Sequence, residues 1–384
     1  MYLNSIELHR FRNILQGKLC FSDRITLVVG RNGQGKTSLL EAVFFLAHAK
    51  SFRTSVLKEL STWDSDTSAT SVKGIVSSNS GEKNLCCKLI SGSREVYLND
   101  SRIQKASSFY GQLACIEFTP DHLEILKGQP RLRRIFLDRI LAMCDSTYVD
   151  NLVAYQRALK NRNAVLRNSQ QQIDYRELLP WDELLAVHGR IVVSKRLDLA
   201  VALKESFRRN YEFFLRDSSQ GLSRAIESVD YELKSNLVND SDLLSPAELA
   251  ANYETSFSTD RRRKSTSIGP HRDDLLFYLS GKHGCYSARK LASQGQIRSI
   301  ALALTLSAAE YLEKSLSESP IILLDDVISE LDKYRRAALF ELLQGLSKQI
   351  IITATEADSN LLADLGNPAV VEMAEGQMTP RKSA

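Results

Sequence analysis

The sequence has little of what marks secreted, zinc-binding or membrane proteins. Its six cysteines are scattered along 384 residues and none forms a C-x-x-C pair, which argues against a zinc site and is typical of reduced thiols. No apolar run approaches the roughly 20 residues that a helix needs to cross a bilayer. The first residues carry neither the basic nor the apolar stretch of a signal peptide. We therefore expect a cytoplasmic protein with no membrane partner.

The composition that remains is that of an ordinary globular protein. Hydrophobic residues make up 43% of the chain and charged residues 25%, which suits one large domain or two moderate ones. The formal net charge is +4. This mild charge neither demands nor excludes nucleic acid, because the local clustering of charges decides binding.

Strand-like and helix-like patterns occur in blocks along the chain. Strand patterns lie at 6–11, at 24–29 and, in short segments, at 61–116, with a helical pattern at 37–49. Helical patterns dominate from about residue 120 to about residue 258 and are clearest at 135–143, 155–166 and 184–211. Further on, strand patterns lie at 275–279, 321–324 and 349–353, and helical patterns at 296–316 and after 332. We predict an α/β domain formed by residues 1–120 and 261–384, with a helical domain at 121–260 inserted into it.

Residues 30–37 fit the phosphate-loop pattern G-x-x-x-x-G-K-[ST] between a predicted strand and a predicted helix. The loop consists of Gly30, Arg31, Asn32, Gly33, Gln34, Gly35, Lys36 and Thr37. Its backbone N–H groups can converge on phosphate oxygens at the start of a helix. Lys36 can reach the β- and γ-phosphates and assist catalysis, and the Thr37 hydroxyl can bind Mg²⁺. The loop therefore predicts binding of ATP and Mg²⁺, with Lys36 facing solvent when no nucleotide is bound.

A second motif is the apolar run at 321–324, which ends in Asp325 and Asp326. Such a run suits a strand buried in a parallel sheet, and ligands bind at the carboxyl ends of such strands. We predict that Asp325 holds Mg²⁺, directly or through water, and that Asp326 orients or deprotonates the attacking water. A buried strand followed by an acidic helix cap would give the same pattern. Because Thr37 and Asp325 lie near opposite ends of the chain, we expect one nucleotide site built from both.

Several further segments carry a family resemblance. The segment A-S-Q-G-Q at 292–296 is similar to the signature motif S-G-G-Q of ABC ATPases, and S-E-L-D at 329–332 is similar to their D-loop. The other segments are F-R-N at 11–13, F-T-P-D at 118–121, R-R-I-F-L-D at 133–138 and G-P-H-R-D-D-L at 269–275. In this order the motifs resemble the bacterial RecF family of DNA recombination and repair proteins, relatives of the SMC and Rad50 heads. The resemblance spans nearly the whole chain and is weakest between about residues 140 and 260.

The resemblance implies an ABC-type P-loop ATPase head with a mixed sheet, a helical insertion and no long coiled coil. In ABC ATPases two heads pair around two ATP molecules, so Ser293, Gln294, Gly295 and Gln296 would face the γ-phosphate bound by a partner subunit. Ser329 and Asp332 would form the D-loop. The helix that begins near Gln296 would direct its positive end at that phosphate. Ser293 and Gln296 are also spaced as a capping box, and both roles are compatible.

Some positions remain open. His122 stands where the family more often has an acid. Thr353 and Thr355 are both candidates for the switch position after the last strand, and no glutamine can be assigned to the Q-loop. His271 and Arg272 suit either a dimer or DNA surface, or a role in bracing a strand.

The resemblance also implies DNA binding. RecF proteins bind double-stranded and gapped DNA in an ATP-dependent way and act with RecO and RecR to load RecA, in repair, replication maintenance and the SOS response. The expected activity is a weak, DNA-stimulated ATPase that works as an ATP-dependent homodimer. Candidate phosphate contacts are Arg131, Arg133 and Arg134; Arg157, Lys160, Arg162 and Arg167; and Arg261, Arg262, Arg263 and Lys264. Any one of these clusters would also suit a solvated helix face.

Three alternatives compete with this interpretation. An energy-coupling subunit of a membrane transporter would share the nucleotide motifs, but not F-R-N, the long insertion or G-P-H-R-D-D-L. An SMC- or Rad50-type clamp would need a sustained heptad repeat, which the insertion lacks. A nucleotide-gated binding module with negligible turnover would differ from a working ATPase in phosphate release alone.

Overall fold

The structure, a computed structural model, describes residues 1–22, 24–62, 69–168, 174–215, 226–239, 242–281, 284–344, 348–357 and 359–381. Unit 1 comprises Met1–Leu123, Ser206–Ala225 and Ser293–Ala384, and unit 2 comprises Glu124–Glu205 and Ile226–Ala292. The division differs from the expected boundaries, because residues 261–292 group with the insertion. The reason is that β12 (Asp274–Gly281) pairs with β9 (Ile226–Lys234) of the same unit. Among the described residues, no helix is long and apolar enough to cross a membrane.

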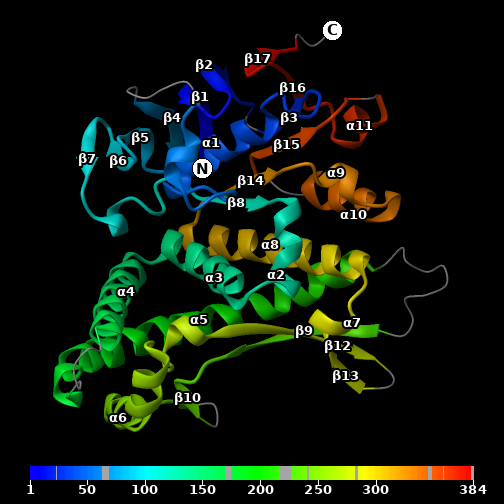
Figure 1. The fold of residues 1–384 in the computed structure, drawn as a ribbon. Helices are drawn as coiled ribbons and strands as arrows, with labels where there is room; N and C mark the ends of the chain where they lie inside the picture. The colour runs from blue at the N-terminus through cyan, green and yellow to red at the C-terminus, as the bar shows by residue number, and fades with distance from the viewer. Residues whose placement is uncertain are drawn as a thin grey trace. The chain divides into compact units, whose positions relative to one another are not determined.

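Unit 1 contains two six-stranded sheets (Figure 1). The first sheet has the order β2-β1-β4-β5-β6-β7, with strands at Tyr2–Phe11, Ile14–Cys20, Thr70–Ser78, Gly81–Ile90, Ser93–Leu98 and Ser101–Ile103. The second has the order β17-β16-β3-β15-β14-β8, with strands at Ile25–Val29, Cys115–Phe118, Ile321–Leu324, Ile350–Ala354, Ala369–Ala374 and Gln377–Pro380. The first sheet is antiparallel, and the second is parallel except for β17. The predicted mixed α/β architecture is therefore confirmed.

Helices complete unit 1. They are α1 (Lys36–His48), α8 (Gln294–Leu316), α9 (Val327–Glu330), α10 (Lys333–Gln344) and α11 (Ser359–Asp364), with short 3₁₀ turns at Leu57–Leu60, Ala106–Ser108 and Pro120–Leu123. Helix α1 is buried along nearly its whole length and packs in one apolar core with both sheets. Because α1 is packed against both sheets, the position of the C-terminal end of the loop that precedes it is fixed.

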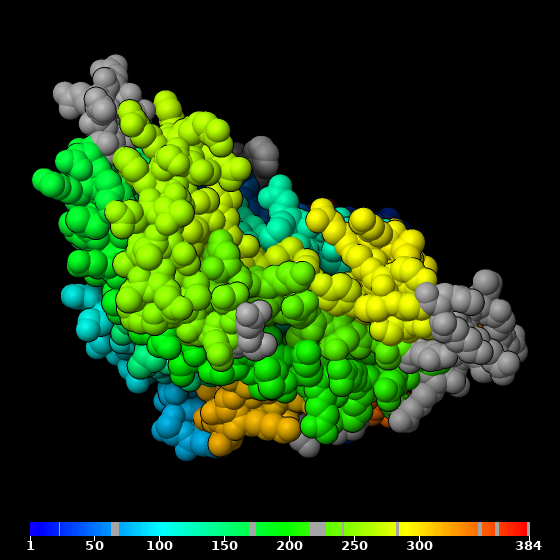
Figure 2. All heavy atoms as spheres, turned by 90° about the horizontal axis from the view of Figure 1, so that it is seen from below, coloured from blue at the N-terminus to red at the C-terminus, as the bar shows by residue number. Residues whose placement is uncertain are grey.

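Unit 2 is mainly helical. Its helices are α2 (Glu124–Lys127), α3 (Pro130–Cys144), α4 (Ser146–Arg167), α5 (Leu179–Phe213, whose last residues belong to unit 1), α6 (Pro246–Arg263) and α7 (Ala288–Leu291). Its strands are β9, β10 (Val238–Asn239), β11 (Asp242–Leu243), β12 and β13 (Gly284–Ser287), with 3₁₀ turns at Tyr175–Glu177 and Pro270–Arg272. The described part shows no long coiled coil. Figure 2 shows α6, in yellow-green, at the surface of this unit.

Local signals set several of these helix boundaries. Asp145 caps α4 by accepting hydrogen bonds from two backbone N–H groups. Ser245 and Glu248 form a capping box at the start of α6, where Pro246 occupies the first turn. The strand β9 was not predicted, because helical segments surround it. Its buried residues Val229 and Tyr231 nevertheless alternate with exposed or half-buried ones, which is the strand pattern.

Candidate nucleotide site

The phosphate loop joins the end of β3, a strand buried at all five positions, to the start of α1. Gly33 and Gly35 have φ angles of 81° and 111°, which L-amino acids with side chains rarely adopt. The turn after β16 braces the loop, because the backbone N–H groups of Glu375 and Gly376 donate to Gln34. The predicted strand-loop-helix context is therefore present, and the loop is held in shape by its neighbours.

Lys36 does not face solvent, and that expectation is wrong. Its residue is only 7% exposed, and Nζ donates hydrogen bonds to the carbonyl oxygens of Gly30 at 2.5 Å and Arg31 at 3.1 Å. Burial lowers the pKa of the Lys36 amine, while the nearby charges of Asp326 and Asp325 act in the opposite direction. A buried ammonium needs acceptors, and the loop supplies them from its own backbone.

The acidic pair meets the phosphate loop directly. Oδ1 of Asp325 accepts hydrogen bonds from the hydroxyls of Thr37 at 3.0 Å and Thr353 at 2.8 Å. Burial raises the pKa of the Asp325 carboxyl, the two hydroxyls lower it, and Asp326 raises it further. The Thr353 hydroxyl in turn accepts from the backbone N–H of Asp326 at 2.8 Å. The fold thus assembles the two predicted halves into one site.

Asp326 has an unusual backbone. Its φ of 49° lies in the left-handed region, and residues held there cluster at functional sites. It stands at the N-terminus of α9 but makes no side-chain capping hydrogen bond. Its carbonyl accepts from the hydroxyl of Ser329 at 2.9 Å. A simple helix cap therefore does not account for this carboxylate.

The donor set fits a magnesium ion. Mg²⁺ prefers oxygen ligands in octahedral geometry at about 2.0–2.1 Å, so adjacent ligands lie about 2.9 Å apart. The Thr37 and Asp325 oxygens are 3.0 Å apart. A hydroxyl and a carboxylate at this separation can both ligate one cation.

The F-R-N segment supports the loop from the side. Arg12 donates to both carboxylate oxygens of Glu41 at 2.8 Å, and Glu41 is fully buried in α1. The Ser51 hydroxyl also donates to Glu41. Asn13 lies against the loop, where its amide nitrogen is 3.4 Å from the Gly33 carbonyl oxygen. These contacts explain the motif as a brace between β1, α1 and the phosphate loop.

The signature residues form the start of α8, a 23-residue helix. Ser293 and Gln296 make the predicted capping box, in which each side chain binds the other's backbone N–H. Ser293 and Gln294 are exposed, and Gly295 and Gln296 are half-buried. In the D-loop, Asp332 contacts Arg335 of α10. The turn at 293–296, called the signature turn below, is therefore ordered and accessible.

The structure gives contacts to two positions that the sequence left open, the switch candidates and His122, and to Arg53, which the sequence did not identify. Thr353 is fully buried and links the two acids, whereas the other switch candidate, Thr355, is exposed. Arg53 lies 3.9 Å from Glu41, and its charge lowers the pKa of Asp325. His122 lies 3.6 Å from Glu117 and has its Nδ1 3.1 Å from the Thr119 nitrogen. The spacing of Arg53 and Asp325 matches no motif, so only the fold brings these two residues near each other.

The predicted DNA contacts separate into buried and exposed residues. Arg133 is 2% exposed, pairs with both oxygens of Asp274 and donates to the Ile125 carbonyl. Its assignment as a DNA contact is wrong, because its donors are used inside unit 2. Arg134 is half-buried and donates to the Asp273 carbonyl at 2.6 Å. The exposed candidates are Arg131, Arg157, Lys160, Arg167, Arg261, Arg262, Arg263 and Lys264.

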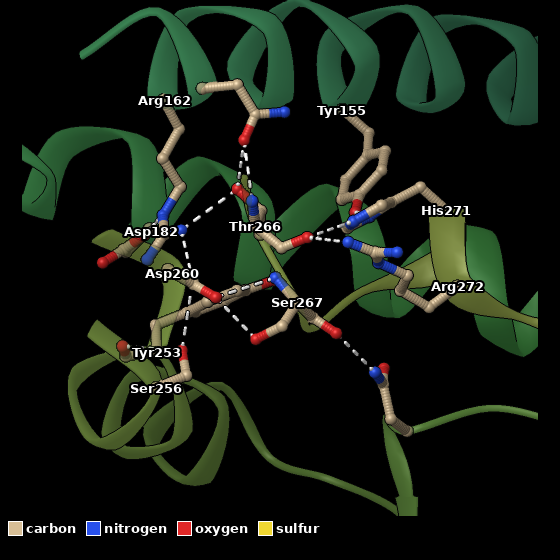
Figure 3. Close-up of polar contacts among 12 residues, drawn as sticks. Tyr155, Arg162, Asp182, Tyr253, Ser256, Asp260, Thr266, Ser267, His271 and Arg272 are labelled. Atoms are coloured by element: carbon tan, nitrogen blue, oxygen red, sulfur yellow. Dashed lines mark hydrogen bonds and ion pairs between the residues drawn. The ribbon is translucent and has the colours of Figure 1, made fainter. Parts of the chain in front are cut away.

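Arg162 is the second candidate that the structure places in the interior. It is fully buried and pairs with Asp182 at 2.5 Å and Asp260 at 2.6 Å (Figure 3). Its Nη1 also donates to the Thr266 hydroxyl at 3.0 Å. The pKa of Asp182 is raised by burial, which the Arg162 charge opposes. Arg162 therefore joins α4, α5 and α6 and cannot contact DNA.

The segment at 269–275 braces unit 2. The His271 Nε2 lies 2.9 Å from the Thr266 carbonyl oxygen and Nδ1 lies 2.6 Å from the Tyr155 hydroxyl (Figure 3). This network assigns the proton to Nε2, so the hydroxyl donates to Nδ1. Asp273 accepts from Arg196 at 2.7 Å. The open question about His271 resolves in favour of a structural role.

A phosphate loop and an acidic strand end at one edge of a predominantly parallel sheet, together with the signature turn at the start of α8, define an ABC-type P-loop ATPase head. The sequence matches the family described as RecF/RecN/SMC N terminal domain over residues 2–379. It is 36% identical over 358 residues to the DNA replication and repair protein RecF of Streptococcus pneumoniae (strain ATCC 700669 / Spain 23F-1), covering 93% of each chain. The chain therefore belongs to the RecF family. This membership excludes the alternative of a transporter's energy-coupling subunit.

Solved structures agree with this assignment. A structure of the recombination mediator protein RecF with ATP, in the RecFOR pathway, matches with a TM-score of 0.86 and 29% identity, covering 99% of this chain and 97% of that one. An Smc head bound to the C-terminal winged-helix domain of ScpA matches with a TM-score of 0.57 at 15% identity, covering 99% of this chain and 97% of that one. The second likeness concerns the fold alone.

Proposed function

We propose that this protein is an ATP-dependent DNA-binding ATPase of DNA repair and replication. The observation that carries the proposal is the contact between Thr37 and Asp325, which completes a site suited to Mg²⁺ and nucleotide. A relative named as a DNA replication and repair protein supports the DNA-directed part. A similar structure named with ATP supports the choice of nucleotide.

The chemistry follows from the positions of four side chains. Lys36 binds the β- and γ-phosphates after leaving its carbonyl partners. Thr37 and Asp325 would hold Mg²⁺, which would supply positive charge to neutralise the phosphates. Asp326 orients the attacking water and accepts its proton. The water oxygen bonds to the γ-phosphorus as the bond to the β-phosphate oxygen breaks, which gives ADP and phosphate. Slow turnover suits a protein whose ATP-bound state does the binding.

The signature turn extends this site to a dimer. Ser293 and Gln294 are exposed at the start of α8, where backbone N–H groups favour an anion. We infer that this turn covers the γ-phosphate held by the phosphate loop of a second copy. Two ATP molecules then join two heads, and hydrolysis separates them.

DNA is the macromolecular ligand in this proposal. The exposed arginines at the end of α6, together with Arg131 of α3, can neutralise phosphates without reading bases. Double-stranded and gapped DNA are the expected targets. RecO and RecR are the expected partners in loading RecA, since a similar structure is named for the RecFOR pathway.

Light-scattering mass tests the dimer directly. The protein would be measured with ATP, with ADP and without nucleotide, each with and without duplex DNA. We expect the mass to double with ATP alone among the nucleotides, and duplex binding to require ATP. A protein that binds ATP but keeps the monomer mass would refute the sandwich, while leaving the nucleotide site in place.

A further inference from the structure

Arg335 of α10 lies against the signature turn of its own chain. A Cβ atom placed on Gly295 would be 2.8 Å from Nη2 and 2.9 Å from both Cζ and Nη1 of Arg335. Real Cβ atoms almost never come so close to other heavy atoms, so an alanine at 295 would displace the guanidinium. The glycine at this position therefore leaves room for the Arg335 guanidinium where it now lies, whatever it also does for a phosphate.

The same guanidinium holds two other residues. Its Nε donates to the hydroxyl of Ser299, a fully buried residue of α8, at 2.9 Å. Its Nη1 pairs with the carboxylate of Asp332, and the Arg335 backbone N–H donates to Oδ1 of Asp332 at 3.0 Å. Although burial raises the pKa of the Asp332 carboxyl, these contacts with Arg335 outweigh it, and the pKa is lowered. One side chain thus connects the signature helix to the D-loop at residues 329–332.

The D-loop leads in turn to the acidic pair. The Ser329 hydroxyl donates to the carbonyl of Asp326 at 2.9 Å, and the Asp326 N–H donates to Thr353 at 2.8 Å. Thr353 donates to Asp325 at 2.8 Å. The backbone of the D-loop therefore links the contacts at the signature turn to the residues beside this chain's own nucleotide site.

Stabilisation of α8 does not explain why Arg335 lies beside its N-terminus. A cation near the N-terminus of a helix is unfavourable, because it meets the positive end of the helix dipole. The Asp332 carboxylate offsets that repulsion locally. The contact to Gly295 places the charge beside the segment proposed to meet the partner's nucleotide.

We propose that Arg335 is a positioning residue that joins the signature turn to the D-loop, so that both approach the partner's nucleotide as one body. The inference rests on the proposed ATP-dependent dimer. Arg335 makes no contact with the phosphate loop in this role. Replacing Arg335 should leave ATP binding by a single chain intact. It should weaken only ATP-dependent dimer formation and the turnover that depends on the dimer.

The first test separates binding from turnover in Arg335→Ala. We expect the ATP affinity measured on the monomer to stay within about twofold and the ATP-dependent dimer and kcat each to fall at least tenfold, with KM little changed. Arg335→Lys, which keeps the charge, should recover part of the loss. Arg336→Ala, on the next position of α10, is the matched control and should behave as the wild type.

The second test is a double-mutant cycle with Gly295→Ala. If the alanine acts by displacing the guanidinium, it should reduce dimer formation in the wild type and have little further effect in Arg335→Ala. Independent losses that multiply would show that Gly295 acts on the phosphate directly and would overturn the inference. Arg335→Gln replaces Arg335→Ala in the cycle if the alanine variant has a lowered melting temperature.

The outcomes also distinguish this inference from the proposed function. A wild-type protein that stays monomeric with ATP overturns the dimer, and the role of Arg335 with it. A wild-type protein that dimerises while Arg335→Ala dimerises equally well overturns the role of Arg335 alone.

Discussion

The hydroxyl of Thr37 donates a hydrogen bond of 3.0 Å to Oδ1 of Asp325, although 288 positions separate the two residues. The contact exists because β14, which ends at Leu324, and β3, which precedes the phosphate loop, both pair with β15. Parallel strands place their carboxyl ends at one edge of a sheet. The nucleotide site therefore forms only when both ends of the chain have folded together.

The two acids should have separable roles. Asp325→Asn removes the charge beside Thr37, so Mg-ATP affinity and turnover should both fall at least tenfold. Asp326→Asn should leave ATP affinity within about threefold and lower kcat by about 10²–10⁴, the usual contribution of a general base. Isothermal titration and phosphate release would measure these values. Equal effects of both variants on affinity would contradict the assignment.

Asp326→Asn also gives a sensitive test of the dimer. If hydrolysis separates the heads, this variant should accumulate as an ATP-bound dimer in light scattering. Adding Ser293→Arg, which places a bulky cation in the signature turn, should return it to a monomer. A monomeric Asp326→Asn protein that binds ATP normally would refute the sandwich.

Lys36→Ala should greatly weaken ATP binding. The ammonium is the one full positive charge within the loop that can reach the β- and γ-phosphates, and a charged hydrogen bond contributes about 1.5–3 kcal/mol, or roughly 10–100-fold in affinity. The folded state should tolerate the change, because the variant removes a buried ammonium whose pKa burial lowers. Unchanged nucleotide affinity in a folded Lys36→Ala protein would overturn the ATP site.

Local patterns explain how much of the head could be predicted. The apolar run at 321–324 forms β14 at those residues, and the pattern at 37–49 forms α1 at Lys36–His48. Both elements are buried, so their apolar character is continuous and easy to recognise. The capping box of Ser293 and Gln296 was also predictable, because all its parts lie within four residues.

Burial of charged residues could not be predicted in the same way. Arg162 looks like any surface arginine in the sequence, and its partners Asp182 and Asp260 are 20 and 98 positions away. Arg133 depends likewise on Asp274, 141 positions away. A cluster of positive charge shows the residue types but not which of them find carboxylates within the fold.

The remaining DNA assignment predicts a salt effect. If Arg261 and Arg263 each neutralise one phosphate, replacing both by alanine should lower the slope of log K against log salt by about 1.8, at about 0.9 for each contact. Binding should weaken equally for duplexes of different sequence. Lys58→Ala, an exposed cation of unit 1, is the control. An unchanged slope would show that the end of α6 does not contact DNA phosphates.

Arg162 should matter for stability. Arg162→Ala leaves Asp182 and Asp260 buried without their partner, and breaking a buried pair in this way typically destabilises by about 3–5 kcal/mol. Arg157→Ala, on an exposed part of the same helix, should change stability by less than about 0.5 kcal/mol. Urea denaturation of the two variants would measure the difference. A mild effect of Arg162→Ala would mean that the two aspartates find other donors or bind protons.

His271 should make unit 2 sensitive to acid. Burial lowers the pKa of its imidazole from 6.5 to about 4, the hydrogen bond to Thr266 opposes this, and the charge of Arg272 adds to it. Between pH 6.5 and 4 the His271 imidazole binds a proton in the unfolded chain but not in the folded one. The contribution of the uncharged imidazole to the free energy of unfolding is therefore complete above about pH 6.5 and is lost as the pH falls toward 4. From about pH 7 to about pH 5 the loss due to His271 should be about 2 kcal/mol.

Comparing variants isolates this contribution from those of the other titrating groups. The free energy of unfolding of His271→Gln should decline less steeply with acid than that of the wild type, by about 2 kcal/mol over the same interval. Tyr155→Phe removes the hydroxyl that Nδ1 accepts but keeps the imidazole buried, so it should lower stability at neutral pH and retain the wild-type slope. If the slopes of the wild type and His271→Gln coincide, the imidazole binds its proton as readily in the folded protein as in the unfolded chain, and the acid sensitivity comes from other groups.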